Sequence, residues 1–140
     1  MIVDERLVTY INSLDTGNTE ILDQIEKEAI AAYVPIIRKE MQSFLKLLLA
    51  MQKPMRILEV GTAVGFSAIL MAQYAPADCK IVTIENYEKR IPVAKENFKR
   101  AGKDEQITLL EGDAMQILPT LSGEFDMIFM DAAKGQYINF

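Results

Sequence analysis

The sequence predicts an α/β fold with a doubly wound, mostly parallel sheet, and three observations lead to that prediction. From residue 54 onward, short apolar runs alternate with longer amphipathic segments, the order that produces right-handed βαβ crossovers. The apolar runs are nearly continuous, as in strands whose two faces are both covered. Residues 1–53 show only helical periodicity, so we expect them to form a helical N-terminal extension.

Residues 1–53 are expected to form three helices. The first has one apolar face, made of Leu7, Ile11 and Leu14. The second begins at Asn18 or Thr19, which are both suitable N-caps, and ends before Pro35 because the residue that precedes a proline avoids the α region. Its apolar stripe is made of Ile21, Leu22, Ile25, Ala29 and Ile30.

The third helix, at about residues 38–51, has a broader apolar stripe than the other two. A stripe of that width is typical of a helix that packs on a sheet, so this is where we expect it to lie. The stripe is made of Met41, Phe44, Leu45, Leu48 and Leu49.

Residues 54–140 contain four expected strands, at residues 56–60, 80–85, 107–111 and 126–130. Helices are expected between them, at about residues 65–74 and 88–101, with a short one near 113–121. Pro92 makes the second of these begin late or kink, and Gly102 ends it. The side chains expected to face inward from this helix are Ile91, Val93, Ala94 and Phe98. The whole chain, residues 1–140, is expected to be one domain.

Composition excludes several classes of protein. The 140-residue chain has 15 basic and 20 acidic residues, and its net charge of −5 gives no reason to expect a nucleic-acid surface. It contains no histidine, so a Ser-His-Asp triad or a His-ligated zinc within this chain is excluded. The single cysteine, Cys79, cannot form an internal disulfide, so a reduced, cytoplasmic location is expected. We expect no signal peptide and no membrane span.

The first strand ends in a glycine loop, and ligands of parallel sheets bind at the carboxyl ends of the strands. Gly61 and Gly65 have the spacing G-x-x-x-G, with Glu59 before the loop and Ser67 after it. This spacing lacks the third glycine of a dinucleotide fingerprint, so a ligand without a pyrophosphate is favoured. Glu59 suggests that a cationic ligand group lies nearby. A plain strand-to-helix turn without a ligand is the alternative.

Acidic residues end the other three strands as well. Glu85 can accept hydrogen bonds from both hydroxyls of a ribose, or it is a solvated strand-end acid. Asp113 can accept from an adenine amino group, cap the following helix, or do both. Asp131 can bind Mg²⁺ and Lys134 can act as a general base. The alternative for this last pair is an N-capping acid and a surface lysine.

Together, the four strand ends resemble the S-adenosylmethionine (SAM)-dependent class I methyltransferases. More narrowly, the chain is similar to the cation-dependent O-methyltransferases of the catechol and caffeoyl-coenzyme A type, and to bacterial members that methylate 5-hydroxyuridine in tRNA. The segments that carry the resemblance are residues 34–37, 59–67 and 131–137. It implies a Rossmann-like fold and methyl transfer from SAM, assisted by Mg²⁺, to a hydroxyl of a small molecule or of a nucleoside in tRNA.

The resemblance also implies residue roles. Gly61 and Ser67 would hold the methionine part of SAM, Glu85 the ribose, and Asp113 with Ala114 the adenine. The full set of implied cofactor contacts is Ile37, Glu59, Gly61, Ser67, Glu85, Asp113, Ala114 and Asp131. The implied catalytic residues are Asp131, as the first metal ligand, and Lys134, as the base.

The chain departs from the family pattern after Asp131. The family's sheet has seven strands, and an Asp-Asn pair at the end of the fifth supplies two further metal ligands, which nothing after Asp131 matches. We therefore expect residues 54–140 to be the cofactor-binding half, with a bare apolar edge at residues 127–130 that promotes a homodimer or larger oligomer. Two alternatives stay open: a catalytically incomplete SAM-binding fragment, and a dinucleotide-binding protein.

Overall fold

Four parallel strands form the sheet: β1 (Arg56–Val60), β2 (Lys80–Glu85), β3 (Ile107–Glu111) and β4 (Met127–Met130). The computed structural model describes residues 4–132, so Lys134 and the other residues after 132 lie outside the described part. The strand order is β3-β2-β1-β4. The direction of winding therefore reverses between β1 and β4, which is where ligands of such sheets bind.

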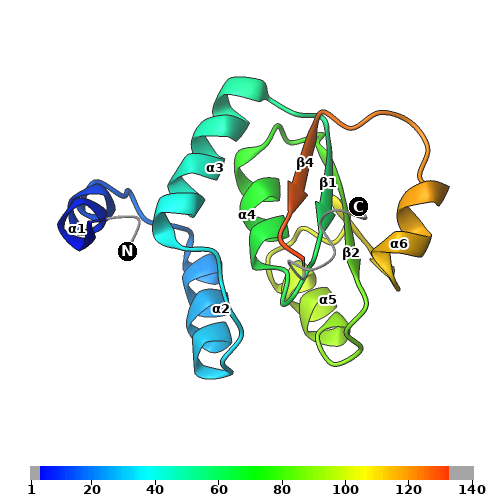
Figure 1. Ribbon diagram of the computed structural model, residues 1–140, viewed down its shortest axis with the longest axis horizontal. Helices are drawn as coiled ribbons and strands as arrows, with labels where there is room; N and C mark the ends of the chain where they lie inside the picture. The colour runs from blue at the N-terminus through cyan, green and yellow to red at the C-terminus, as the bar shows by residue number, and fades with distance from the viewer. Residues whose placement is uncertain (1–3, 133–140) are drawn as a thin grey trace.

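Helices cover both faces of this sheet. α4 (Phe66–Tyr74) and α5 (Ile91–Arg100) pack on one face, and α6 (Ala114–Ile117) packs on the other, followed by a 3-10 turn (Leu118–Thr120). Figure 1 shows α4 and α6 on opposite sides of the strands. The predicted doubly wound α/β class is confirmed, and each predicted strand lies within one residue of its observed bounds.

Successive side chains along each strand point to opposite faces of the sheet, so the core is divided into two clusters. Ile57, Ile81 and Ile107 belong to the larger cluster, under α4 and α5. Leu58, Val60 and Ile84 belong to the smaller cluster, on the side of α6. Residues 66–72 of α4 are all buried, because this helix lies between the sheet and the N-terminal helices.

The N-terminal extension consists of α1 (Glu5–Ser13), α2 (Glu20–Ala31) and α3 (Lys39–Gln52). The expectation that α3 packs on the sheet is wrong. α3 packs on α4, which already covers that face of the sheet, and Figure 1 shows the two helices side by side. Its buried residues are Gln42, Leu45 and Leu49, whereas Phe44 from the predicted stripe is half exposed.

Three further expectations about side chains need correction. α1 contacts α3 but buries none of its residues, so Leu7, Ile11 and Leu14 form an exposed apolar face. In α2, Ile30 is exposed. In α5, Val93 is exposed as well, because the helix begins at Ile91 and its inward positions follow at helical spacing from there.

Two polar contacts join distant parts of the chain. The Asp126 carboxylate accepts backbone hydrogen bonds from Met55 (2.8 Å) and Arg56 (2.9 Å), so it ties the start of β4 to the start of β1. The buried Asn97 side chain donates to the Val64 carbonyl (2.9 Å) and ties α5 to the glycine loop. Among the described residues, no helix has both the length and the apolar composition that crossing a membrane requires.

Candidate functional site: two adjoining cavities at the carboxyl ends of the strands

The glycine loop after β1 is held tightly by the protein itself. A Cβ on Gly61 (φ +99°) would lie 2.6 Å from the Asp131 carbonyl oxygen, and one on Gly65 (φ +85°) would lie 2.5 Å from the Phe98 ring. The Gly61 and Thr62 amides both donate to the Ile84 carbonyl, at 3.0 and 3.2 Å. Both glycines are therefore required by neighbouring parts of the chain, in addition to any ligand.

Two cavities open beside this loop. The strand-end cavity, about 370 Å³, lies at the carboxyl ends of β1, β2 and β3. The loop cavity, about 560 Å³, lies between the glycine loop and the segment at residues 35–41. They adjoin, because both are lined by Gly61, Ala63, Arg90, Asp131 and Ala132. An elongated ligand can therefore occupy the two together.

Glu85 lines the strand-end cavity and also organises its wall. One carboxylate oxygen accepts from the Ala63 amide (2.8 Å), and the other accepts from the amides of Asn86 (3.1 Å) and Tyr87 (2.9 Å). A carboxylate has about four lone-pair sites, so these three bonds leave capacity for a ligand hydroxyl. The same side chain thus shapes the loop and faces the cavity.

Asp113 and Ala114 line the strand-end cavity from the opposite wall. The Asp113 side chain accepts a hydrogen bond from the Met115 amide (2.9 Å), so it is the N-cap of α6, one of the two predicted roles. Its position at the cavity leaves the other role, a contact with adenine, as a prediction.

Glu59 is the one predicted cofactor contact that lines neither cavity. Its side chain is fully buried beside Ser67 of α4, and a cationic ligand group near it stays a prediction. Its carboxylate accepts hydrogen bonds from the hydroxyls of Ser67 and Thr83, the latter at 2.5 Å. Ser67 lines the loop cavity. Thr62 also lines it, and its hydroxyl lies 2.6 Å from that of Thr83, so hydrogen bonds link Glu59 to this cavity by two routes.

Burial raises the pKa of Glu59 from its ordinary value of 4.5 to about 7. The hydrogen bonds from Ser67 and Thr83 oppose this rise, and the negative charges of Asp131 and Glu85 add to it. A buried carboxyl without a cationic partner is costly to ionise. Such strongly perturbed acids are concentrated at functional sites.

Asp131 follows β4 and lines both cavities. Its amide donates to the Val60 carbonyl (3.0 Å), which extends the pairing of β1 with β4 to the site. Within residues 4–132, no group of three or more His, Cys, Asp or Glu side chains is arranged to hold a metal ion. Asp131 is thus the one predicted magnesium ligand among the described residues, and a magnesium site here stays a prediction.

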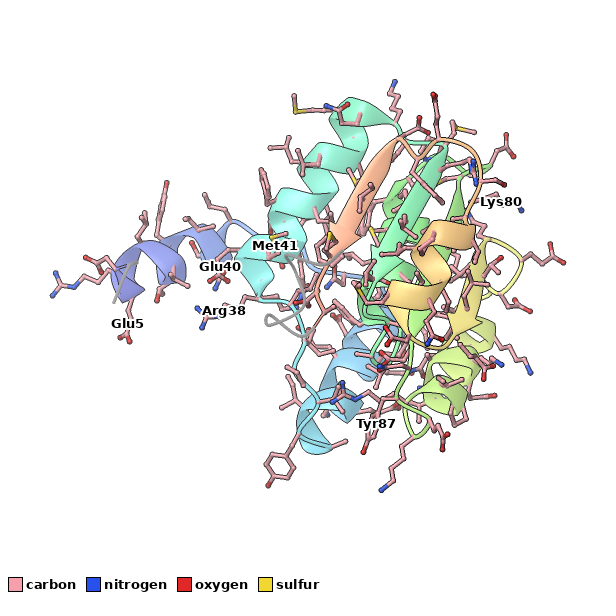
Figure 2. All side chains as sticks on the ribbon, turned by 45° about the vertical axis from the view of Figure 1, so that its right-hand side comes forward. Glu5, Arg38, Glu40, Met41, Lys80 and Tyr87 are labelled. Atoms are coloured by element: carbon pink, nitrogen blue, oxygen red, sulfur yellow. The ribbon has the colours of Figure 1, made fainter. Side chains whose placement is uncertain are left out.

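The sequence did not single out several residues that line these cavities. Asn86, Tyr87 and Arg90 follow β2 and line the strand-end cavity, and their position just after a strand-end acid was the available signal. Arg38 and Met41 line the loop cavity from the start of α3, and their signal was weaker because they are distant in sequence from every strand end. Figure 2 shows the Arg38 side chain extending outward from the start of α3.

A model of the O-methyltransferase family matches residues 12–140. The chain therefore belongs to this family, and the predicted resemblance is confirmed at that level.

Two curated relatives illustrate the match. A catechol O-methyltransferase from Niastella koreensis is 41% identical over 69% of this chain and 46% of its own length. One from Mycobacterium tuberculosis is 36% identical over 89% of this chain and 58% of its own. The chain thus spans about half the length of these relatives.

Solved structures agree with the sequence matches. An SAH-bound methyltransferase from Podospora anserina has a TM-score of 0.89 at 31% identity, over 96% of this chain and 59% of that one. An O-methyltransferase from Streptomyces achromogenes, solved in complex with SAM, has a TM-score of 0.83 at 31% identity, over 97% and 65%.

Proposed function

We propose that the chain binds SAM across the two adjoining cavities and supplies the methyl-donor site of an O-methyltransferase. The observation that carries this proposal is the convergence of the predicted cofactor residues. All of them except Glu59 line one cavity or the other, although they come from four strand ends and the loop before α3. The SAH and SAM complexes of the similar structures support the same ligand.

The roles divide between the cavities. In the strand-end cavity, Glu85 accepts a hydrogen bond from a ribose hydroxyl, while Asp113 and Ala114 border the adenine. In the loop cavity, Ser67 and Ile37 contact the methionine end. Gly61 lines both cavities, so the ligand would pass this residue where the two meet.

SAM, when bound, supplies a methyl group on a positively charged sulfur. The protein must hold an acceptor oxygen in line with that methyl, which is a proximity effect. The new bond joins oxygen to the methyl carbon, the carbon–sulfur bond breaks, and S-adenosylhomocysteine leaves. The acceptor's proton goes to a base, for which we propose Lys134 by family resemblance, with Asp131 beside the reacting groups. We derive no step through magnesium, because Asp131 is the one predicted ligand among the described residues.

The proposed acceptor is a small molecule with a catechol-like or phenolic hydroxyl, since the curated relatives are named for catechol and caffeoyl-CoA. A hydroxylated nucleoside in tRNA is the alternative acceptor, and the net charge of −5 disfavours it.

Self-association of the chain is also proposed. β4 is an edge of the sheet among the described strands, its Ile128 is exposed, and α1 carries an exposed apolar face. The cytoplasmic location stays a prediction from sequence.

Calorimetric titration with SAM tests the proposal. Glu85→Gln is expected to raise the Kd at least about tenfold, because a hydrogen bond to a charged group contributes about 1.5–3 kcal/mol. The matched control is Glu111→Gln, since Glu111 pairs with Glu85 in register on β3 and lies outside both cavities. The control should bind like the wild type. Failure of the wild type to bind SAM, or equal loss in both variants, would contradict the proposal.

Titration with NAD separates the dinucleotide-binding alternative. The G-x-x-x-G loop lacks the third glycine of a dinucleotide fingerprint, and its two glycines pack against the Asp131 backbone and the Phe98 ring. We expect SAM to bind and NAD not to bind. Binding of SAM without methyl transfer to any hydroxylated acceptor would favour the alternative of a catalytically incomplete fragment.

A further inference from the structure

A buried polar network lies behind the loop cavity, on the side of the N-terminal helices. Its centre is Gln42 of α3, which is only 1% exposed. The Gln42 amide nitrogen donates to the Glu26 carboxylate and to the Ile37 carbonyl, both at 2.9 Å. The amide oxygen accepts from the Asn18 side chain at 2.8 Å. Lys39 donates to the other Glu26 oxygen, also at 2.8 Å.

The network fixes the Gln42 amide in one orientation. Both of its N–H groups face acceptors, and its oxygen faces a donor. A flipped amide would direct its oxygen at a carboxylate and a carbonyl. Complete satisfaction of a buried amide in this way makes it a rigid point in the fold.

This rigid point holds a segment that has no regular structure of its own. Residues 34–38 lie between α2 and α3 in neither helix nor strand. Backbone bonds anchor the segment at its two ends, from the Val34 amide to the Ala29 carbonyl (2.8 Å) and from the Gln42 amide to the Arg38 carbonyl (2.9 Å). The bond from the Gln42 side chain reaches the segment between those anchors, at Ile37.

The same segment is the wall of the loop cavity that faces the glycine loop. Pro35, Ile36, Ile37 and Arg38 all line that cavity, and none of them lines the strand-end cavity. Figure 2 shows the Arg38 side chain directed away from the sheet. Any change in how Ile37 is held therefore acts on one of the two cavities.

We infer that Gln42 is a positioning residue for the cofactor: through its bond to the Ile37 carbonyl, it holds residues 35–38 as the wall against the methionine end of SAM. This inference rests on the proposed function. Gln42 does not contact the ligand. It keeps the segment in the conformation that can bind, and the apparent Kd rises in proportion when that conformation becomes less populated.

Two ligands separate this role from a general contribution to stability. SAM reaches both cavities, whereas 5′-methylthioadenosine lacks the amino-acid end and needs only the strand-end cavity. Gln42→Met keeps a similar length and removes both N–H donors. We expect it to raise the Kd for SAM about tenfold, or about 1.4 kcal/mol, and to leave the Kd for 5′-methylthioadenosine within about twofold.

Asn18→Ala is the matched control, because it removes a bond within the same network and keeps both donors of Gln42. It should lower the melting temperature without changing either Kd. The double variant Glu26→Gln/Gln42→Glu is the second test and also serves if Gln42→Met does not fold. It restores a hydrogen bond between positions 26 and 42 but leaves the Ile37 carbonyl facing a carboxylate, so binding of SAM should stay weak.

The inference is overturned if Gln42→Met binds SAM like the wild type, or if it weakens both ligands equally. It is also overturned if the double variant regains wild-type affinity for SAM, since that would assign the effect to the contact between positions 26 and 42. A wild-type chain that binds 5′-methylthioadenosine but not SAM overturns it as well. A wild-type chain that binds neither ligand contradicts the proposed function itself.

Discussion

Glu59 makes the stability of this protein depend on pH in a direction that can be worked out from its burial. The pKa of the folded carboxyl, about 7, lies above its ordinary value of 4.5. Between these values the native state binds more protons than the unfolded state, so the free energy of unfolding falls as the pH rises. The contribution of the neutral carboxyl is fully present below about pH 4.5 and is lost by about pH 7.

The size of the effect follows from the same two values. A rise from 4.5 to about 7 corresponds to roughly 3 kcal/mol, most of which is lost between pH 5 and pH 8. Glu59→Gln has the same shape and cannot ionise. The amide can still accept from the Ser67 hydroxyl and donate to that of Thr83, which can then donate to the Thr62 hydroxyl 2.6 Å away. We expect this variant to resemble the wild type at pH 5 and to be more stable by about 2–3 kcal/mol at pH 8.

Urea unfolding followed by circular dichroism at the two pH values measures this difference. Glu124→Gln removes an exposed acid and is the control, for which the difference between the two pH values should match that of the wild type. Equal stability of Glu59→Gln and the wild type at pH 8 would refute the reasoning. Loss of stability in Glu59→Gln at both pH values would refute it too, since that would mean the ionised form is the one that the fold requires.

Three further predictions concern the parts that hold the site together, and thermal melts check each of them. Gly102→Ala should lower the free energy of unfolding by about 1 kcal/mol, from its positive φ alone, because nothing lies within 4 Å of the new methyl. Gly61→Ala and Gly65→Ala should lower it by at least about 3 kcal/mol, because their new methyls also clash with neighbouring atoms. Equal losses in the three variants would contradict this prediction. Asn97→Ala should cost about 1–3 kcal/mol by leaving a buried carbonyl unpaired, and an unchanged melting temperature would count against it. The backbone amides of Arg56 and Met55 donate hydrogen bonds to Asp126 and lower the pKa of its carboxyl. The ionised carboxylate therefore stabilises the fold above the usual carboxyl pKa, and this stabilisation is lost as the pH falls. Asp126→Asn should therefore make the melting temperature depend less on pH in the acid range.

Most of the fold could be predicted from local patterns. The four strands are short, mainly apolar runs, and the alternation of these runs with helical segments specifies parallel crossovers. The packing of α3 could not be predicted in this way. Its apolar stripe shows that it packs on something, but the choice between the sheet and α4 depends on which helix already covers that face.

The residues at the strand ends of the candidate site could be predicted from the sequence, but the buried contacts behind them could not. The carboxyl ends of parallel strands meet at one edge, so residues such as Glu85 and Asp131 could be brought together from sequence. The burial of Glu59 could not, because it depends on Ser67, eight residues further along the chain, and on Thr83 of the neighbouring strand. Gln42 bonds to three residues that lie 5, 16 and 24 positions away in the sequence. Such spacings have no regular period, so the sequence did not indicate these bonds.

The central claim is that the strand-end cavity and the loop cavity form one site for one cofactor. Titration of the isotope-labelled chain with S-adenosylhomocysteine, followed by amide chemical shifts in NMR, tests it directly. We predict shifts in both cavities at the same ligand concentration, at Ala114 in the strand-end cavity, at Ile37 and Ser67 in the loop cavity, and at Gly61 between them. Shifts confined to one cavity, or centred elsewhere on the protein, would contradict the claim.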